Sequence, residues 1–114
     1  MTQKVPGDLH IANEVLADLA GRAALECYGV VGMSVPDVSD GIATLLPNSR
    51  SRRGIVVKQS EAGVHVDLYV IIEYGTNITA VSRNLIDQVT FALKNNTAAK
   101  IDAVEVKVQG VRHR

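Results

Sequence analysis

The sequence predicts an α+β fold, a two-layer sandwich in which a mixed β-sheet carries three helices packed on one face. The main observation is residues 64–75, whose even positions are all apolar and whose odd positions are mostly polar or charged. Successive side chains of a strand point to opposite faces, so this segment is a long strand with one buried and one solvated face. Residues 101–109 show the same alternation, and three other segments each show an apolar stripe at helical spacing. Helices covering the apolar face of the sheet would satisfy all of these segments.

The N-terminal half is expected to contain two helices and a strand, with a further short strand at residues 9–11. The first helix begins at the N-cap residue Asn13 and ends at Gly29. Its apolar stripe consists of Val15, Leu16, Leu19, Ala20, Ala23 and Cys27. An apolar strand over 30–35 follows it. Asp37 or Ser39 then caps a second, short helix, whose inward-facing residues are Val38, Ile42, Leu45 and Leu46.

In the C-terminal half, we expect Arg50–Gly54 to form an exposed, mobile loop because it is the one local excess of charge. Strands over 55–60 and 64–74 are joined by a connection short enough for an antiparallel hairpin. A third helix follows Asn77 and ends at Asn95–Asn96, with a stripe made of Ile78, Val81, Leu85, Val89 and Leu93. In the last strand, one face carries Val104, Val106 and Val108.

The length of 114 residues indicates a single domain, which we place at 9–111 with flexible tails at 1–8 and 112–114. Twelve basic and twelve acidic residues cancel, so the overall charge does not call for nucleic acid or anionic lipid as a partner. Cys27 is the only cysteine, which excludes an intrachain disulfide and a thiolate metal cluster; we expect a small buried hydrophobe. No 18-residue apolar run and no signal-peptide pattern is present, so the chain is expected in the cytoplasm.

The solvated face of the long strand gathers the ionisable groups His65, Asp67 and Glu73, with Glu105 and Lys107 on a neighbouring strand. Side chains at i and i+2 share a face, so His65 and Asp67 have the chemistry to hold a metal or to transfer a proton. A metal site needs three or four ligands, and a flat sheet offers no concavity. We therefore interpret this face as solvated cross-strand charge pairs, with no catalytic residue, metal or cofactor.

Tyr69 and Ile71 stand on the same face beside charged neighbours. An apolar pair rimmed by polar groups is typical of a self-association or partner surface. Packing under the basic loop or under a terminal segment explains the pair equally well. The predicted interaction surface consists of Tyr69, Ile71, Asp67, Glu73, Arg50, Arg52 and Arg53.

Nucleic-acid binding is the alternative function. Residues 29–32 spell the Gly-x-x-Gly loop of KH domains, although both middle residues are valine and no lysine or arginine adjoins them. Arg50, Arg52, Arg53 and Arg112 would have to contact the phosphates.

Several short segments carry a resemblance to a known family: Asn13-Glu14-Val15-Leu16-Ala17, Gly29-Val30-Val31-Gly32-Met33, Gly41-Ile42-Ala43, Val66-Asp67-Leu68-Tyr69-Val70, Glu73-Tyr74-Gly75 and Val106-Lys107-Val108-Gln109-Gly110-Val111. In their order and spacing over residues 9–111 they resemble the bacterial alkaline-shock (Gls general-stress) family. The Asp-Leu-Tyr strand and the terminal Val-Gln-Gly-Val are the most specific pieces. The basic loop 50–53 and the tail 112–114 depart from the family pattern.

The resemblance implies an envelope-stress-associated protein of Gram-positive-type bacteria without enzymatic activity. It implies a cytoplasmic protein that is often held at the inner face of the membrane by a separate anchor protein. Together with Tyr69 and Ile71, it predicts a non-enzymatic module that forms homo-oligomers or docks on such a partner, without inserting into the membrane itself.

Overall fold

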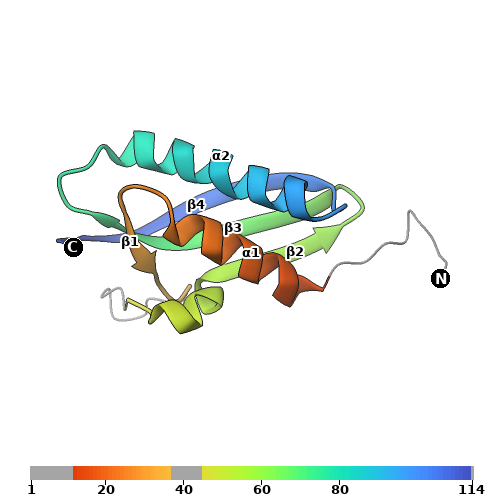
Figure 1. The fold of residues 1–114 in the computed structure, drawn as a ribbon, viewed down its shortest axis with the longest axis horizontal. Coiled ribbons are helices and arrows are strands. Elements are labelled where there is room, and N and C mark those ends of the chain that lie inside the picture. The colour runs from red at the N-terminus through yellow and green to blue at the C-terminus, as the bar shows by residue number, and fades with distance from the viewer. Residues whose placement is uncertain (1–11, 37–44, 114) are drawn as a thin grey trace.

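The computed structural model describes residues 12–36 and 45–113, and these have mixed α and β content (Figure 1). In chain order, the elements are α1 (Asn13–Leu25), β1 (Val30–Met33), the 3₁₀ helix η2 (Asn48–Gly54), β2 (Ile55–Ser60), β3 (Gly63–Glu73), α2 (Ile78–Asn96) and β4 (Ile101–Arg112).

β3 is the central strand of the sheet. β4 pairs with it in parallel from Val64 to Glu73, and the other side of β3 is shared by two antiparallel strands. β2 pairs with residues 63–68 and β1 with residues 70–72. The sheet is therefore mixed, as expected. The predicted hairpin is confirmed, because Ser60 pairs with Gly63 across a two-residue loop.

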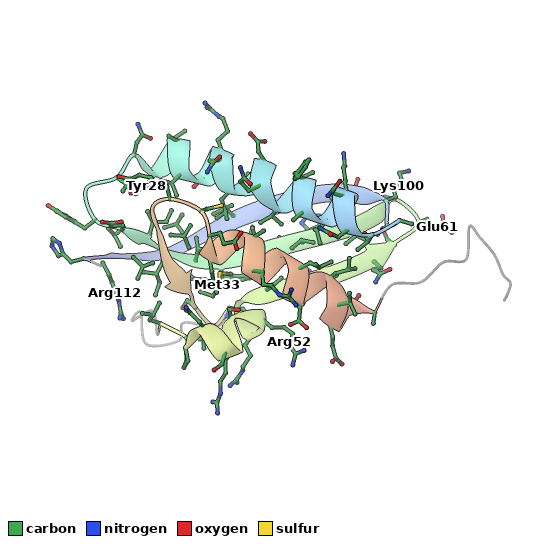
Figure 2. All side chains as sticks on the ribbon, in the orientation of Figure 1. Tyr28, Met33, Arg52, Glu61, Lys100 and Arg112 are labelled. Carbon is green, nitrogen blue, oxygen red and sulfur yellow. The ribbon has the colours of Figure 1, made fainter. Side chains whose placement is uncertain are left out.

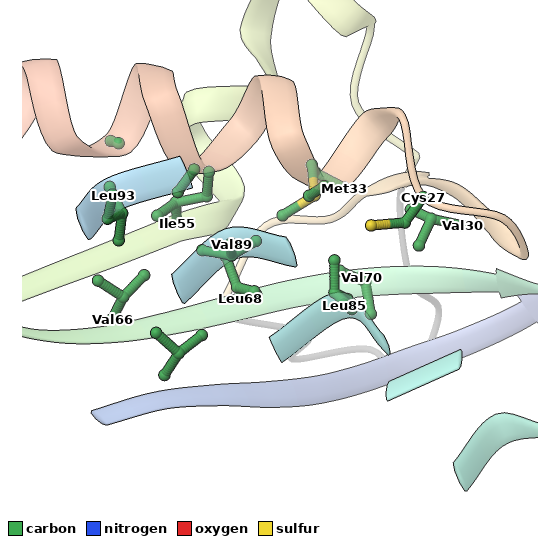
Figure 3. Packing of buried hydrophobic residues seen from close by; sticks show 14 of the residues in the cluster. Cys27, Val30, Met33, Ile55, Val66, Leu68, Val70, Leu85, Val89 and Leu93 are labelled. Atoms are coloured by element: carbon green, nitrogen blue, oxygen red, sulfur yellow. The ribbon is translucent and has the colours of Figure 1, made fainter. Parts of the chain in front are cut away.

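The hydrophobic core lies between the even-numbered face of β3 and the two α-helices (Figure 3). The β3 side chains buried on this face are Val64, Val66, Leu68, Val70 and Ile72. α1 and α2 lie on the same side of the sheet in Figure 1, and both contribute buried residues to this one cluster. On β4, Val104 is buried, and Val106 packs partly buried against the same cluster. The predicted apolar face of β3 is thus confirmed. That of β4 is covered at Val104 and partly at Val106, whereas Val108 is 38% exposed.

α2 follows its predicted stripe closely. Asn77 is its N-cap, and the side-chain oxygen accepts a hydrogen bond from Ala80 N at 3.0 Å. Of the five predicted stripe residues, Ile78 is the exception, since it is 44% exposed at the start of the helix.

The prediction that Asn13 is the N-cap of the first helix is wrong. Ala12 occupies the N-cap position and makes no side-chain capping bond. Asn13 is already helical, and its amide bonds to β2 instead: Nδ2 donates to Val57 O at 3.3 Å, and Oδ1 accepts from Gln59 Nε2 at 2.6 Å. Partners that are distant in sequence have replaced the local cap.

The predicted end and stripe of this helix also need correction. α1 ends at Leu25, four residues before Gly29, which has a φ of +88° in the following turn. Val15 is 49% exposed rather than part of the buried stripe. Ala17 and Ala24 are buried in its place.

Two expectations for the middle of the chain are wrong where the structure describes it. The predicted second helix lies mostly in residues 37–44, outside the described residues, and its last two positions are extended. Leu45 forms an antiparallel bridge with Ser34, and Leu46 N donates to Met33 O at 2.8 Å. The predicted mobile loop 50–54 instead belongs to η2, which packs against α1.

The C-terminal residues also differ from the prediction of a tail that starts at residue 112. Arg112 is the last residue of β4, and its carbonyl oxygen accepts from Tyr74 N at 2.7 Å. The His113 ring lies 4.7 Å from the Tyr74 ring. The predicted strand at 9–11 and the tail 1–8 fall outside the described residues.

Candidate interaction surface

The candidate surface is the face of the sheet opposite α1 and α2, made by the odd-numbered residues of β3 and their neighbours on β4. We call it the polar sheet face and define it by His65, Asp67, Tyr69, Glu105 and Lys107. The strand pairing places Asp67 beside Glu105 and Tyr69 beside Lys107. Side chains directly opposite one another on adjacent strands share a face and interact.

A charge network occupies one end of the polar sheet face. His65 Nε2 lies 3.1 Å from Asp67 Oδ1 and 3.0 Å from Glu105 Oε2. Lys107 Nζ donates to the other carboxylate oxygen of Glu105, Oε1, at 3.2 Å. Two carboxylates side by side repel each other, and the ammonium group of Lys107 offsets this repulsion. The predicted cross-strand charge pairs are present.

The pKa of Lys107 is raised, first by its hydrogen bond to Glu105 and then by the negative charge of that carboxylate. Lys107 is therefore a firmly protonated cation at neutral pH. Asp67 is the buried member of the network, only 8% exposed, whereas Glu105 is exposed.

This network has the donor types of a metal site but also its own counter-charges. The ligand atoms of His65, Asp67 and Glu105 lie within 4.8 Å of one another, and an imidazole with two carboxylates suits zinc. Lys107 would then place a positive charge against one of the ligands. The four side chains thus pair with one another as a charge network, and the expectation of no metal stays a prediction.

Glu73 is not brought to this network. It lies eight residues from His65 along the strand, roughly 26 Å at the usual rise per residue, and pairs in register with Arg112. The predicted grouping of His65, Asp67 and Glu73 therefore separates into two places on the strand.

Ile71 is not exposed, which favours the packing alternative over an exposed apolar pair. Its exposed fraction is 0%, although it stands on the face opposite the helices. Its register neighbours are Gly32 on β1 and Gly110 on β4. A Cβ built on Gly32 would lie 2.7 Å from Leu45 Cδ1, so the Leu45 side chain lies over this end of the face. Packing under another segment thus accounts for Ile71, while Tyr69 remains half-buried with part of its surface open.

The arginines of residues 50–53 lie elsewhere. η2 packs against α1, so Arg52 lies on the helix side of the molecule (Figure 2). Its guanidinium lies 3.6 Å from carboxylate oxygens of both Glu14 and Asp18. Arg22, Arg50 and Arg53 line a hollow beside this pair. The structure does not bring the predicted arginines and Tyr69 into one surface.

Sequence reasoning missed the burial of Asp67 and the role of Asn13. It also missed the outer side of β4, along which none of the described strands pairs. No described helix is both long enough and apolar enough to cross a membrane.

Comparisons with known proteins agree with the family suggested by the motifs. The chain is 39% identical over 107 residues to the uncharacterized protein YloU of Bacillus subtilis, covering 93% of this chain and 89% of YloU. It is 34% identical over 116 residues to the uncharacterized protein Spy1614 of Streptococcus pyogenes, covering 98% and 96%. Among solved structures, "MamM-CTD D249A and H264A" superposes with a TM-score of 0.49 and 12% identity, covering 89% of this chain and 93% of that one.

A family model matches residues 1–113, nearly the whole chain. The chain belongs to the alkaline-shock protein 23 family, which is described as having a cell envelope-related function.

Proposed function

We propose that this protein is a non-enzymatic interaction module of the cell envelope stress response. It acts at the cytoplasmic face of the membrane by self-association or by docking on a membrane-anchored protein. Residues 9–111 form its single functional unit, a two-layer sandwich. The cell envelope-related family supports this proposal.

The observation that carries the proposal is the open part of the polar sheet face. Around Tyr69, this face combines a half-buried aromatic ring with fixed charges on two strands. Tyrosine surrounded by polar groups is typical of protein interfaces, where the ring supplies contact area and the rim supplies specificity. Because Ile71 is buried, Tyr69 supplies the apolar contact without it.

Nucleic-acid binding is less well supported. Arg52 is paired with two acidic residues of α1, so part of the positive charge of residues 50–53 is already neutralised. The Gly-x-x-Gly segment is a turn followed by β1, in which Val30 is buried. A protein partner therefore accounts better for the surface.

In-cell crosslinking of a Tyr69→Asp variant tests the proposal. The matched control is Phe91→Asp on α2, because Phe91 is 66% exposed on the opposite side of the molecule. We expect Tyr69→Asp to lose a specific crosslinked protein and its recovery with the membrane fraction, while Phe91→Asp keeps both. Unchanged crosslinks in a folded Tyr69→Asp protein would refute docking through this face. Ile71→Asp is unsuitable, since a charge at this buried position would unfold the chain.

A further inference from the structure

The longest strand of the sheet is also one of its edges. β4 spans twelve residues, Ile101–Arg112, and pairs with β3 on one side only among the described strands. Lys100 and Arg112 mark its two ends in Figure 2. Unpaired N–H and C=O groups along a long, regular edge are a template for pairing with another strand. Natural proteins protect such edges with short strands, proline, bulges or charges. This edge is long and contains no proline, and its two register shifts lie near its ends.

The hydrogen bonds of β3 show which β4 residues turn outward. Val64 N donates to Lys100 O at 2.7 Å, and Tyr74 N donates to Arg112 O at 2.7 Å. Backbone groups of successive strand residues point to alternate sides, so the even-numbered residues of β3 bond to β4. In a parallel pair, an even-numbered β3 residue bonds to the two β4 residues on either side of its register partner. The register partner itself therefore points its N–H and C=O away from β3.

Five β4 residues are partners of even-numbered β3 residues and therefore point their backbone groups to the open edge: Ile101, Val104, Val106, Val108 and Val111. The intervals between them are three, two, two and three residues, because the register shifts near both ends of β4. This spacing reads the same in both directions, with Val106 at its centre. Only an antiparallel partner with the same spacing can bond at all five positions, and a second copy of this strand has that spacing.

The side chains follow the same symmetry. In an antiparallel pair of β4 strands centred on Val106, Val104 would lie opposite Val108 of the partner, and Ile101 opposite Val111. These residues share the helix-side face, where Val108 is 38% exposed and Val111 is 44% exposed. Pairing would remove this apolar surface from water.

The charges of Glu105 and Lys107 favour this register over registers shifted by two residues. Centred on Val106, Glu105 lies opposite Lys107 of the partner, and Lys107 lies opposite its Glu105. A shift of two residues in either direction would place Glu105 opposite itself or Lys107 opposite itself. Opposite charges across strands stabilise a pair, and like charges destabilise it.

We propose that β4 pairs antiparallel with β4 of a second copy, about a two-fold axis through Val106. This inference rests on the proposed function, because it names a second copy as one partner of the module. A two-fold axis perpendicular to the sheet keeps the polar sheet faces of both copies on the same side. The dimer then presents two Tyr69 surfaces, and two linked sites raise the avidity for a clustered partner without new contacts.

Charge reversal at the centre of the pairing tests the inference. Sedimentation equilibrium should show a dimer for the natural chain, with dimerisation roughly tenfold weaker or more for Glu105→Lys or Lys107→Glu alone. The double variant Glu105→Lys/Lys107→Glu should dimerise like the natural chain. An equimolar mixture of the two single variants should form heterodimers, because each chain then supplies the charge that the other lacks.

A crosslink fixes the register independently. In a Cys27→Ala background, Val106→Cys lies opposite its own copy at a Cα distance of about 5.5 Å, within disulfide reach. Val104→Cys is the matched control, because its partner is Val108. We expect an oxidised dimer for Val106→Cys only.

The outcomes separate this inference from the proposed function. A natural chain that stays monomeric yet loses a crosslinked partner in Tyr69→Asp would overturn the β4 pairing and leave docking intact. A dimer that ignores charge reversal, or that crosslinks equally at 104 and 106, would overturn it too. A β4-paired dimer with no partner lost in Tyr69→Asp would confirm the pairing and refute docking through the polar sheet face.

Discussion

The two faces of β3 are built from the same backbone but differ in how burial is achieved. On the helix side, all five even-numbered side chains are apolar and buried. On the opposite side, burial does not follow polarity, since charged Asp67 and apolar Ile71 are both buried while Tyr69 is half-buried between them. The first face is covered by whole helices, and the second only where single neighbours such as Leu45 reach it. Alternation in a strand therefore predicts which way a side chain points, and only its neighbours decide how exposed it is.

The largest expected effect lies on the helix side. Leu85 is fully buried between α2 and the sheet, so Leu85→Ala should lower the free energy of unfolding by about 2–5 kcal/mol through the cavity it creates. Denaturant titration measures the change, with Phe91→Ala as an exposed control on the same helix. A midpoint equal to that of the natural chain would show that this face is not tightly packed.

The second largest effect is expected at Asp67, the buried charged residue on the polar sheet face. Asp67→Ala removes a buried acceptor of His65, and we expect a loss of about 1–2 kcal/mol in the free energy of unfolding. Glu105→Ala, in the same network but exposed, should cost about 0.5 kcal/mol or less. Equal losses for the two variants would mean that burial does not distinguish these carboxylates.

Ile71 tests whether the opposite face contains part of the core. Removing one methylene in Ile71→Val should cost about 0.5–1.5 kcal/mol, as in other filled sites. The same change at half-exposed Ile78 should have almost no effect. Thermal unfolding of both variants compares them, and indistinguishable midpoints would contradict the burial of Ile71.

The smallest expected effect concerns the buried thiol of Cys27, whose reactivity reports whether reagents reach the core on the helix side of the sheet. Burial first, and then the charge of Glu26, raise the pKa of this thiol. A raised pKa leaves less thiolate at any given pH, so iodoacetamide should react more slowly with the folded protein than with the denatured chain at pH 8. Because the pKa of Cys27 is higher in the folded than in the unfolded protein, its contribution to the free energy of unfolding is fully present below the ordinary thiol pKa. This contribution is lost as the pH rises through the pKa of the folded state. Mass spectrometry follows the alkylation, and equal rates would show an open core.

Local patterns were sufficient for the elements that determine the core. The periodic spacing of apolar residues alone predicts β3, β4 and α2. The N-cap of α2, Asn77, is also part of the same segment. The family resemblance came from the same local segments.

Tertiary contacts decided the rest. Asn13 has the chemistry of a cap but bonds to β2, and residues 50–53 look like a loop but form η2 beside α1. The burial of Ile71 depends on Leu45 and on two glycines from other strands. None of these partners can be read from the sequence near the residue itself. The charge network was predictable in its members on both strands, but the exclusion of Glu73 was not, because the register of the parallel pairing places Glu73 beside Arg112 instead.

The two helices differ in where their first turn is secured, which bears on the order of folding. α2 can begin on its own, because Asn77 bonds to Ala80 within the same segment. α1 has its first side-chain bonds with Val57 and Gln59, so its start is secured only once the β2–β3 hairpin stands. The first turn of α1 is therefore expected to become ordered after this hairpin, although α1 precedes the hairpin in the chain.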